Sequence, residues 1–163
     1  MNSKKILLHI FSWLAVIITM LTILKFSLEN GTQSSETSNG VVDVIVEALP
    51  NSENITNEQK QDIGSNIRQL AHFSVYLLLG FFFSNAFRLL LDDIMPYPLL
   101  LAVAMSLQFA LFDEFVIQAN TSGRAAEWND IVTDCLGAIC GAIIFDLLFN
   151  LLINLVKRRK SLN

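Results

Sequence analysis

The chain has 163 residues, of which 53% are apolar and only 16% are charged, and its formal net charge is −4. Soluble domains carry about 25% charged residues, so this composition excludes an ordinary soluble globular protein and indicates a membrane protein. The only dense basic cluster, residues 157–160, follows an apolar segment as a membrane-end anchor does, which argues against nucleic-acid binding.

Four apolar segments are each long enough to span a membrane as a helix, which needs about 20 residues. We therefore expect an all-α, polytopic membrane protein, built as a four-transmembrane-helix bundle with a long extracytoplasmic loop after the first helix. The chain is short enough to form a single domain over residues 1–163. The expected helices cover about residues 6–26, 67–91, 97–119 and 130–156, and the outer loop covers residues 27–66.

The first apolar segment follows Lys4 and Lys5, as the apolar core of a cleaved secretory signal peptide also would. Its apolar run is long for a signal peptide, and it ends in residues 25–28 (KFSL) without a small-x-small cleavage pattern. We therefore interpret this segment as an uncleaved anchor, with the cleaved signal peptide as the alternative.

The segment after this anchor is acidic and polar. Between Glu29 and Asp62 it holds seven acidic residues against one basic residue, Lys60. Its Asn, Ser, Thr and Gly content predicts a partly mobile loop. Within it, apolar residues over 41–49 recur at helical spacing, which predicts a short amphipathic helix on the outer membrane surface. Such a helix would cap the bundle, and a role in gripping a substrate is the alternative.

The second and third spanning segments both carry polar residues near one end. Arg68, His72 and Tyr76 are spaced four apart, so they share one helical face at depths that differ by about 6 Å per step. The third segment ends in a second polar group of three residues, and the short loop after it offers a flexible glycine beside a cation; these residues are Asp113, Glu114, Gln118, Gly123 and Arg124.

The fourth segment opens with Asp130 and Asp134, again four residues apart. Gly137 and Gly141 continue the same face and form a GxxxG pair, which allows another helix to approach closely and makes a homo-oligomer through this face conceivable. A second polar row follows toward the other end of the helix and suggests one wall of a polar path; it consists of Asp146, Asn150 and Asn154.

The basic residues predict the orientation of the bundle. Basic residues near helix ends are held on the cytoplasmic side, and basic clusters precede the first segment and follow the fourth. With four crossings, the N-terminus and the C-terminus both lie in the cytoplasm, the turn 91–98 lies inside, and residues 120–129 form an outer loop. Arg68 and Arg124 then lie outside, against the rule, which indicates that partners hold both.

These assignments bring nine polar residues to one depth in the outer half of the membrane: Arg68, His72, Tyr76, Asp113, Glu114, Gln118, Arg124, Asp130 and Asp134. Taken singly, several have a structural explanation: His72 as a helix-linking hydrogen bonder, Arg68 as a snorkelling anchor, Asp130 as an N-cap. Ionisable residues are expensive inside a membrane and pair in the bundle interior, so their gathering indicates a functional site.

Two kinds of chemistry fit this gathering. Arg68 and Arg124 are charge-assisted donors for a phosphate-bearing or zwitterionic lipid headgroup. Three further residues are candidates for binding the same ligand: Tyr76, Gln118 and Asp130.

In a hydrolase or transferase, a His or a carboxylate acts as the general acid or base, and other acids can hold a divalent metal. The candidates for catalysis are His72, Asp113, Glu114 and Asp134. No HExxH, GxSxG, Walker or GxGxxG pattern is present, so the common soluble enzyme classes are excluded. Whether the chain is an enzyme stays open, and no cofactor beyond a possible divalent metal is indicated.

The order and spacing of these pieces resemble the VanZ-like family of membrane proteins, from the end of the first helix to the fourth. The resemblance is carried by Phe26-Ser27 with a Gln/Ser-rich stretch after it, IRQLAHF over residues 67–73 leading to Tyr76 and Gly80, Asp113-Glu114 with Gln118, Gly123-Arg124, and Asp130 through Asp134 to Gly137 and Gly141.

The resemblance implies a four-helix protein of the bacterial cytoplasmic membrane that contributes to resistance against teicoplanin and lipoglycopeptide antibiotics. Its partner would be a membrane lipid or a lipid-linked cell-wall precursor, bound or acted on at the outer polar site. The alternative is a membrane-embedded enzyme that modifies a phospholipid or an isoprenoid-linked wall precursor without a link to resistance. A third possibility is a small transporter subunit that uses the second polar row.

Overall fold

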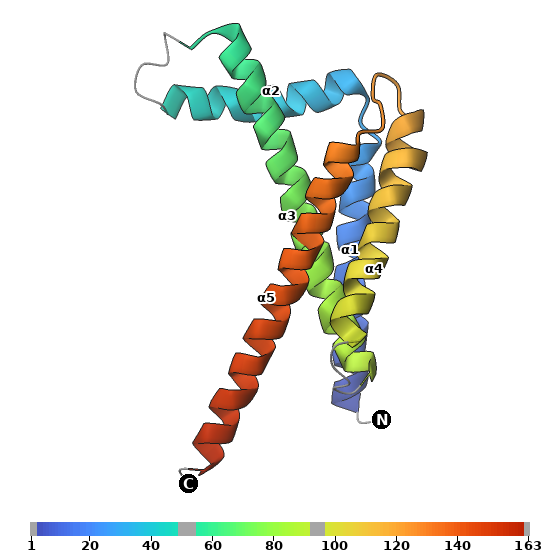
Figure 1. Cartoon of the computed structure of the whole chain (residues 1–163), viewed down its shortest axis with the longest axis vertical. Coiled ribbons are helices and arrows are strands. Elements are labelled where there is room, and N and C mark those ends of the chain that lie inside the picture. Colours follow the sequence, from blue (N-terminus) through green and yellow to red (C-terminus); the bar gives the residue numbers. More distant parts are fainter. Residues whose placement is uncertain (1–2, 49–54, 92–96, 162–163) are drawn as a thin grey trace.

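The computed structural model describes residues 3–48, 55–91 and 97–161, and every regular element within these ranges is a helix (Figure 1). Four of these helices are long and apolar enough to cross a membrane. They are α1 (Ser3–Ser27), α3 (Asn57–Leu91), α4 (Tyr97–Phe112) with its continuation to Asn120, and α5 (Trp128–Ser161). The expectation of an all-α, multi-pass membrane protein is therefore confirmed, whereas a single domain over residues 1–163 stays a prediction.

The helix α2 (Gly31–Ala48) lies across one end of the bundle, beside the first residues of α3 (Figure 1). We call this end, with Ser27 and residues 118–127, the α2 end. Val42 and Val46 of α2 are buried, and Val42 packs over Gly64 of α3. The predicted amphipathic helix over 41–49 is thus present but begins ten residues earlier, and Leu49 lies outside the described residues.

The segment 27–66 contains more helix than its composition suggested. Two capping boxes explain the difference, because in each the first and fourth residues bond reciprocally. At the start of α2, the backbone N–H of Gln33 donates to Asn30 Oδ1 (2.9 Å), and the backbone N–H of Asn30 donates to Gln33 Oε1 (3.2 Å). Thr56 and Gln59 repeat this arrangement before α3, at 2.9 and 3.3 Å. The predicted loop therefore contains α2 and the first turns of α3, each with a capping box. Residues 49–54 lie outside the described residues.

The long helices α3 and α5 cross at glycines (Figure 1). Gly137 and Gly141 lie directly against the backbone of Phe73 and Leu77, and Gly80 of α3 lies against α5 in the same way. A Cβ atom at any of these glycines would collide with backbone, so their absence of a side chain sets how closely the helices approach. The face considered for a homo-oligomer is therefore occupied by α3 of the same chain, and whether the chain forms an oligomer stays a prediction.

Below this crossing, away from α2, an ion pair joins the same two helices. Arg88 of α3 donates to Asp146 Oδ1 of α5 at 2.9 Å, and its guanidinium lies 4.2 Å from the centre of the Phe149 ring. Asn150 and Asn154 are exposed. The second polar row therefore divides into a buried paired acid and two outward-facing amides. Residues 92–96, the middle of the predicted inner turn, lie outside the described residues.

Candidate functional site

Three carboxylic acids are completely buried at the α2 end: Asp113, Glu114 and Asp134 are each 0% exposed. The first two are neighbours in sequence, and neighbours on a regular α-helix point about 100° apart. Here α4 widens into a π-helical turn, Asp113–Ile117, which is continued by the tighter 3₁₀ turn Gln118–Asn120. The widened turn lets both acids face the interior, and single π-helical turns of this kind frequently occur at functional sites.

Side-chain bonds tie Asp113 and Glu114 to their surroundings. Ser27 Oγ, at the end of α1, donates to Asp113 Oδ2 at 2.8 Å. The Gln118 amide donates to the same oxygen at 3.2 Å and to Glu114 Oε2 at 2.6 Å. The other Glu114 oxygen accepts the backbone N–H of Glu127 at 2.7 Å. The network therefore connects α1, the end of α4 and the segment that leads into α5.

The third buried acid pairs with the histidine. His72 Nδ1 on α3 lies 3.1 Å from Asp134 Oδ1 on α5. Asp113 and Asp130 are also close enough to His72 to interact with it electrostatically. Tyr76, one turn further along α3, is also 0% exposed and lies near all three buried acids. His72 and Tyr76 therefore belong to the same buried polar cluster as the acids.

Three buried atoms of this cluster have no hydrogen-bond partner within the described part of the chain: Asp113 Oδ1, Asp134 Oδ2 and Tyr76 Oη. Leaving a buried polar atom unsatisfied costs about 1–3 kcal/mol, and native structures tolerate it where the atom has a further role. One oxygen of Asp113 and one of Asp134 are thus held by protein hydrogen bonds. The other oxygen of each acid and the Tyr76 hydroxyl have no partner among the described residues.

The two arginines at this end differ in how they are held. Arg124 Nη1 donates to the backbone carbonyls of Phe26 (3.0 Å) and Ser27 (3.5 Å). Its loop is fixed to α2, because the Gly31 amide donates to the Ser122 carbonyl at 3.0 Å. Arg68 is exposed and forms no ion pair or hydrogen bond with the residues that the structure describes. The expected partners are thus found for Arg124, as backbone carbonyls. These are neutral groups, so no carboxylate neutralises the charge of Arg124 there.

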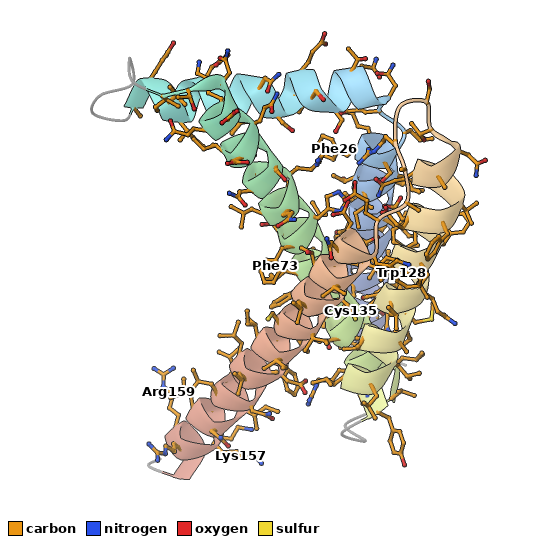
Figure 2. All side chains as sticks on the ribbon, turned by 45° about the horizontal axis from the view of Figure 1, so that its top comes forward. Phe26, Phe73, Trp128, Cys135, Lys157 and Arg159 are labelled. Carbon is orange, nitrogen blue, oxygen red and sulfur yellow. The ribbon has the colours of Figure 1, made fainter. Side chains whose placement is uncertain are left out.

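Two cavities open beside the cluster. The apolar cavity, about 220 Å³, lies between α1, α2 and α3, and His72 and Ser27 contribute to its wall. Figure 2 shows Phe26, another wall residue, at the end of α1 close to α2. The polar cavity, about 430 Å³, lies between the start of α2, the loop after α4 and the start of α5. Both cavities are lined by the same three residues, so they adjoin: Ser34, Arg68 and Arg124.

All nine residues singled out in the sequence therefore lie at the α2 end. Six of them form the buried polar cluster: His72, Tyr76, Asp113, Glu114, Gln118 and Asp134. The other three line the polar cavity: Arg68, Arg124 and Asp130. Within the described ranges, no three His, Cys, Asp or Glu side chains are grouped so that they could hold a metal ion, and the divalent metal stays an untested prediction.

The sequence reasoning missed two members of the site. Ser27 was noted only within the family resemblance, yet its hydroxyl binds Asp113 and its carbonyl accepts from Thr121 at 3.3 Å. Glu127 contributes its backbone N–H to the network. A serine that directly follows an apolar segment is a signal for the first of these; nothing in a single sequence marks the second, because any residue has a backbone N–H.

Comparison with known proteins adds one match. A model of the VanZ/LLP1 family matches residues 11–150, a range that includes every residue of the cluster and of both cavities. No curated protein and no solved structure matches the chain.

Proposed function

This chain belongs to the VanZ/LLP1 family of membrane proteins, and on that premise we propose that its α2 end faces the outside of a bacterial cytoplasmic membrane. There it binds or acts on a lipid or a lipid-linked component of the cell envelope. Through this activity the protein contributes to resistance against teicoplanin and lipoglycopeptide antibiotics.

Charge supports the proposed orientation. The end of α5 carries Lys157, Arg158, Arg159 and Lys160, and Figure 2 shows Lys157 and Arg159 at the opposite end of the molecule from α2. Basic residues at a membrane end are retained in the cytoplasm. With an even number of candidate spans, both termini then lie inside and the cluster lies outside.

The buried polar cluster beneath two adjoining cavities is the observation that carries the proposal. A cluster that served only to hold helices together would be expected to satisfy its own hydrogen bonds. Here Asp113, Asp134 and Tyr76 each leave one buried polar atom without a partner among the described residues. Ionisable residues at membrane depth usually mark a functional site, and lipids are the ligands within reach of cavities at this position.

A catalytic role is the second candidate, and the pair of His72 with Asp134 favours it. A carboxylate on one ring nitrogen orients a histidine and leaves the other nitrogen to transfer protons, which is the arrangement of many general bases. In this proposal the His72 Nε2 atom, which has no hydrogen-bond partner within the described residues, moves a proton to or from a headgroup placed where the two cavities adjoin. The enzyme would modify a phospholipid or a wall-precursor headgroup.

Antibiotic susceptibility tests the proposed function. A sensitive Gram-positive host expresses the unmodified chain, Asp134→Asn, or the control Asp62→Asn, which removes the same charge from an exposed position of α3. At matched membrane levels we expect the unmodified chain and the control to raise the inhibitory concentration of teicoplanin more than that of vancomycin, and Asp134→Asn to lose this protection. Absence of protection by the unmodified chain would refute the resistance assignment.

A further inference from the structure

The two cavities at the α2 end adjoin but differ in character. Apolar atoms make up most of the surface of the apolar cavity, among them those of Ile23, Val41, Ile67 and Val75, although eight of its fourteen lining residues are polar or charged. Serines, glycines and charged residues make up most of the polar cavity. A ligand that occupied both would need an apolar part and a polar part joined directly, which is the construction of an amphiphile.

The volume of the apolar cavity limits that apolar part. At about 220 Å³ it has room for part of one hydrocarbon chain. Its walls come from the membrane-facing helices α1 and α3 and from α2, which lies across them (Figure 1). A chain entering from the surrounding bilayer would exchange one apolar environment for another, so the selectivity of binding must come from the headgroup.

The charges around the polar cavity describe that headgroup. Arg68 and Arg124 contribute two cations, and Glu127 and Asp130 contribute two carboxylates. Among the residues that the structure describes, none of the four forms an ion pair, although they line one cavity. A simple anion would face two carboxylates there, and a simple cation would face two arginines. A headgroup that carries a phosphate and an ammonium group satisfies both pairs.

We propose that the α2 end binds an amine-bearing phospholipid, with one acyl chain in the apolar cavity, the phosphate between Arg68 and Arg124, and the ammonium group beside Glu127 and Asp130. The proposal rests on the proposed function, which places these cavities at the outer membrane surface. It adds the class of lipid. It also gives α2 a role, because Ser34 of α2 lines both cavities at the junction where chain and headgroup meet.

Binding of matched lysolipids to the purified full chain in an uncharged detergent tests the proposal. Lysophosphatidylethanolamine and lysophosphatidylglycerol with the same acyl chain share the chain and the phosphate. Of the three features that the proposal uses, they differ only in the ammonium group. Because a hydrogen bond to a charged group stabilises a complex by roughly an order of magnitude in affinity or more, we expect the ethanolamine lipid to bind about tenfold more tightly or better. Glycerophosphoethanolamine, which has no chain, should bind at least tenfold more weakly than the lysolipid. Equal dissociation constants for the two lysolipids overturn the proposal.

Three variants assign the parts of the site. Asp130→Asn should reduce the preference for the ethanolamine lipid, and Arg68→Gln should weaken both lysolipids alike. Ala71→Phe fills the apolar cavity and should weaken binding at least tenfold, whereas Ala104→Phe, the same change at an exposed position of α4 that lines neither cavity, should not. Unchanged binding by folded Ala71→Phe contradicts the assignment of the chain. The lysolipid comparison uses the unmodified chain, so it decides the question even where a variant does not fold.

The outcome is separable from that of the susceptibility experiment. Preference for the ethanolamine lipid without protection against teicoplanin would remove the resistance assignment and leave the ligand in place. Protection that depends on Asp134, together with equal binding of both lysolipids, would overturn the ligand class and leave the resistance assignment standing.

Discussion

His72 on α3 and Asp134 on α5 meet at 3.1 Å immediately beside the glycine crossing that holds the same two helices together. On the other side of the crossing, Arg88 and Asp146 repeat the arrangement at 2.9 Å. Within the described residues, these two pairs join α3 to α5. The first borders the apolar cavity and the buried atoms without hydrogen-bond partners, whereas neither Arg88 nor Asp146 lines the apolar or the polar cavity. The first pair therefore combines a packing role with a candidate functional one, and the second pair is available as its internal control.

The His72–Asp134 pair predicts non-additive effects of mutation. Removing one member leaves the other polar and buried without its partner, and breaking a buried pair typically destabilises a protein by about 3–5 kcal/mol. We expect His72→Ala and Asp134→Ala each to lower the unfolding temperature in mild detergent, and the double variant to lower it by less than the sum of the two. Strictly additive losses would show that the two side chains are not coupled.

Ser27 predicts a link between α1 and the buried acids. Ser27→Ala removes the donor at 2.8 Å from Asp113 and leaves that carboxyl with Gln118 alone. We expect a loss of about 1–3 kcal/mol in the free energy of unfolding and weaker lysolipid binding. Thr22→Ala is the matched control, because its hydroxyl bonds only the preceding turn of α1 at 2.8 Å, on an exposed face. Equal effects of the two changes would show that the Ser27 hydroxyl has no special role in the site.

The helix crossing predicts a steric effect. Gly141→Ala places a methyl group against the Leu77 carbonyl, which belongs to the backbone and cannot move independently of α3. Overpacking of this kind costs about 1–3 kcal/mol. Gly40→Ala is the control, since nothing lies within 4 Å of its added Cβ on α2. There we expect a gain of about 0.5–1 kcal/mol from helix propensity, measured as a rise in unfolding temperature.

Asp146 predicts a loss of stability that is separate from function. Asp146→Ala removes a buried carboxylate at 2.9 Å from the Arg88 guanidinium, so we expect a loss of several kcal/mol and reduced membrane levels. Once the levels are matched, the preference for the ethanolamine lysolipid should be unchanged. Asn150→Ala, one turn further on an exposed face, should alter neither quantity. A changed lipid preference in Asp146→Ala would show that the two ends of the helix pair are coupled.

The two capping boxes are a local sequence signal for the helices in the segment 27–66. The residues over 30–33 and 56–59 carry the Asn-x-x-Gln and Thr-x-x-Gln spacing of capping boxes, and helices begin at both. Composition outweighed this local signal and predicted a loop over 27–66. Polar helices at a membrane surface have the composition of loops, so where apolar residues do not recur at helical spacing the capping pattern distinguishes the two.

The π-helical turn at Asp113–Ile117 shows what no local pattern supplies. Regular helical geometry would direct Asp113 and Glu114 apart, and the sequence gives no sign that the helix widens there. The turn exists because Ser27 of α1, Gln118 at the end of the same helix and the backbone N–H of Glu127 bind the two carboxyl groups in the interior. Its stability is thus a property of the assembled bundle.

The apolar segments alone indicate a membrane protein with four candidate spans, because the free energy of placing a side chain in lipid depends on that side chain and its near neighbours. The sequence by itself also determined that the polar residues gather at one depth, since depth follows from position along each span. The tertiary structure alone decided which of them touch, that α3 rather than a second copy fills the glycine face, and that two cavities adjoin beneath α2. Those features depend on helix rotation and crossing, which are set by contacts between residues far apart in the chain.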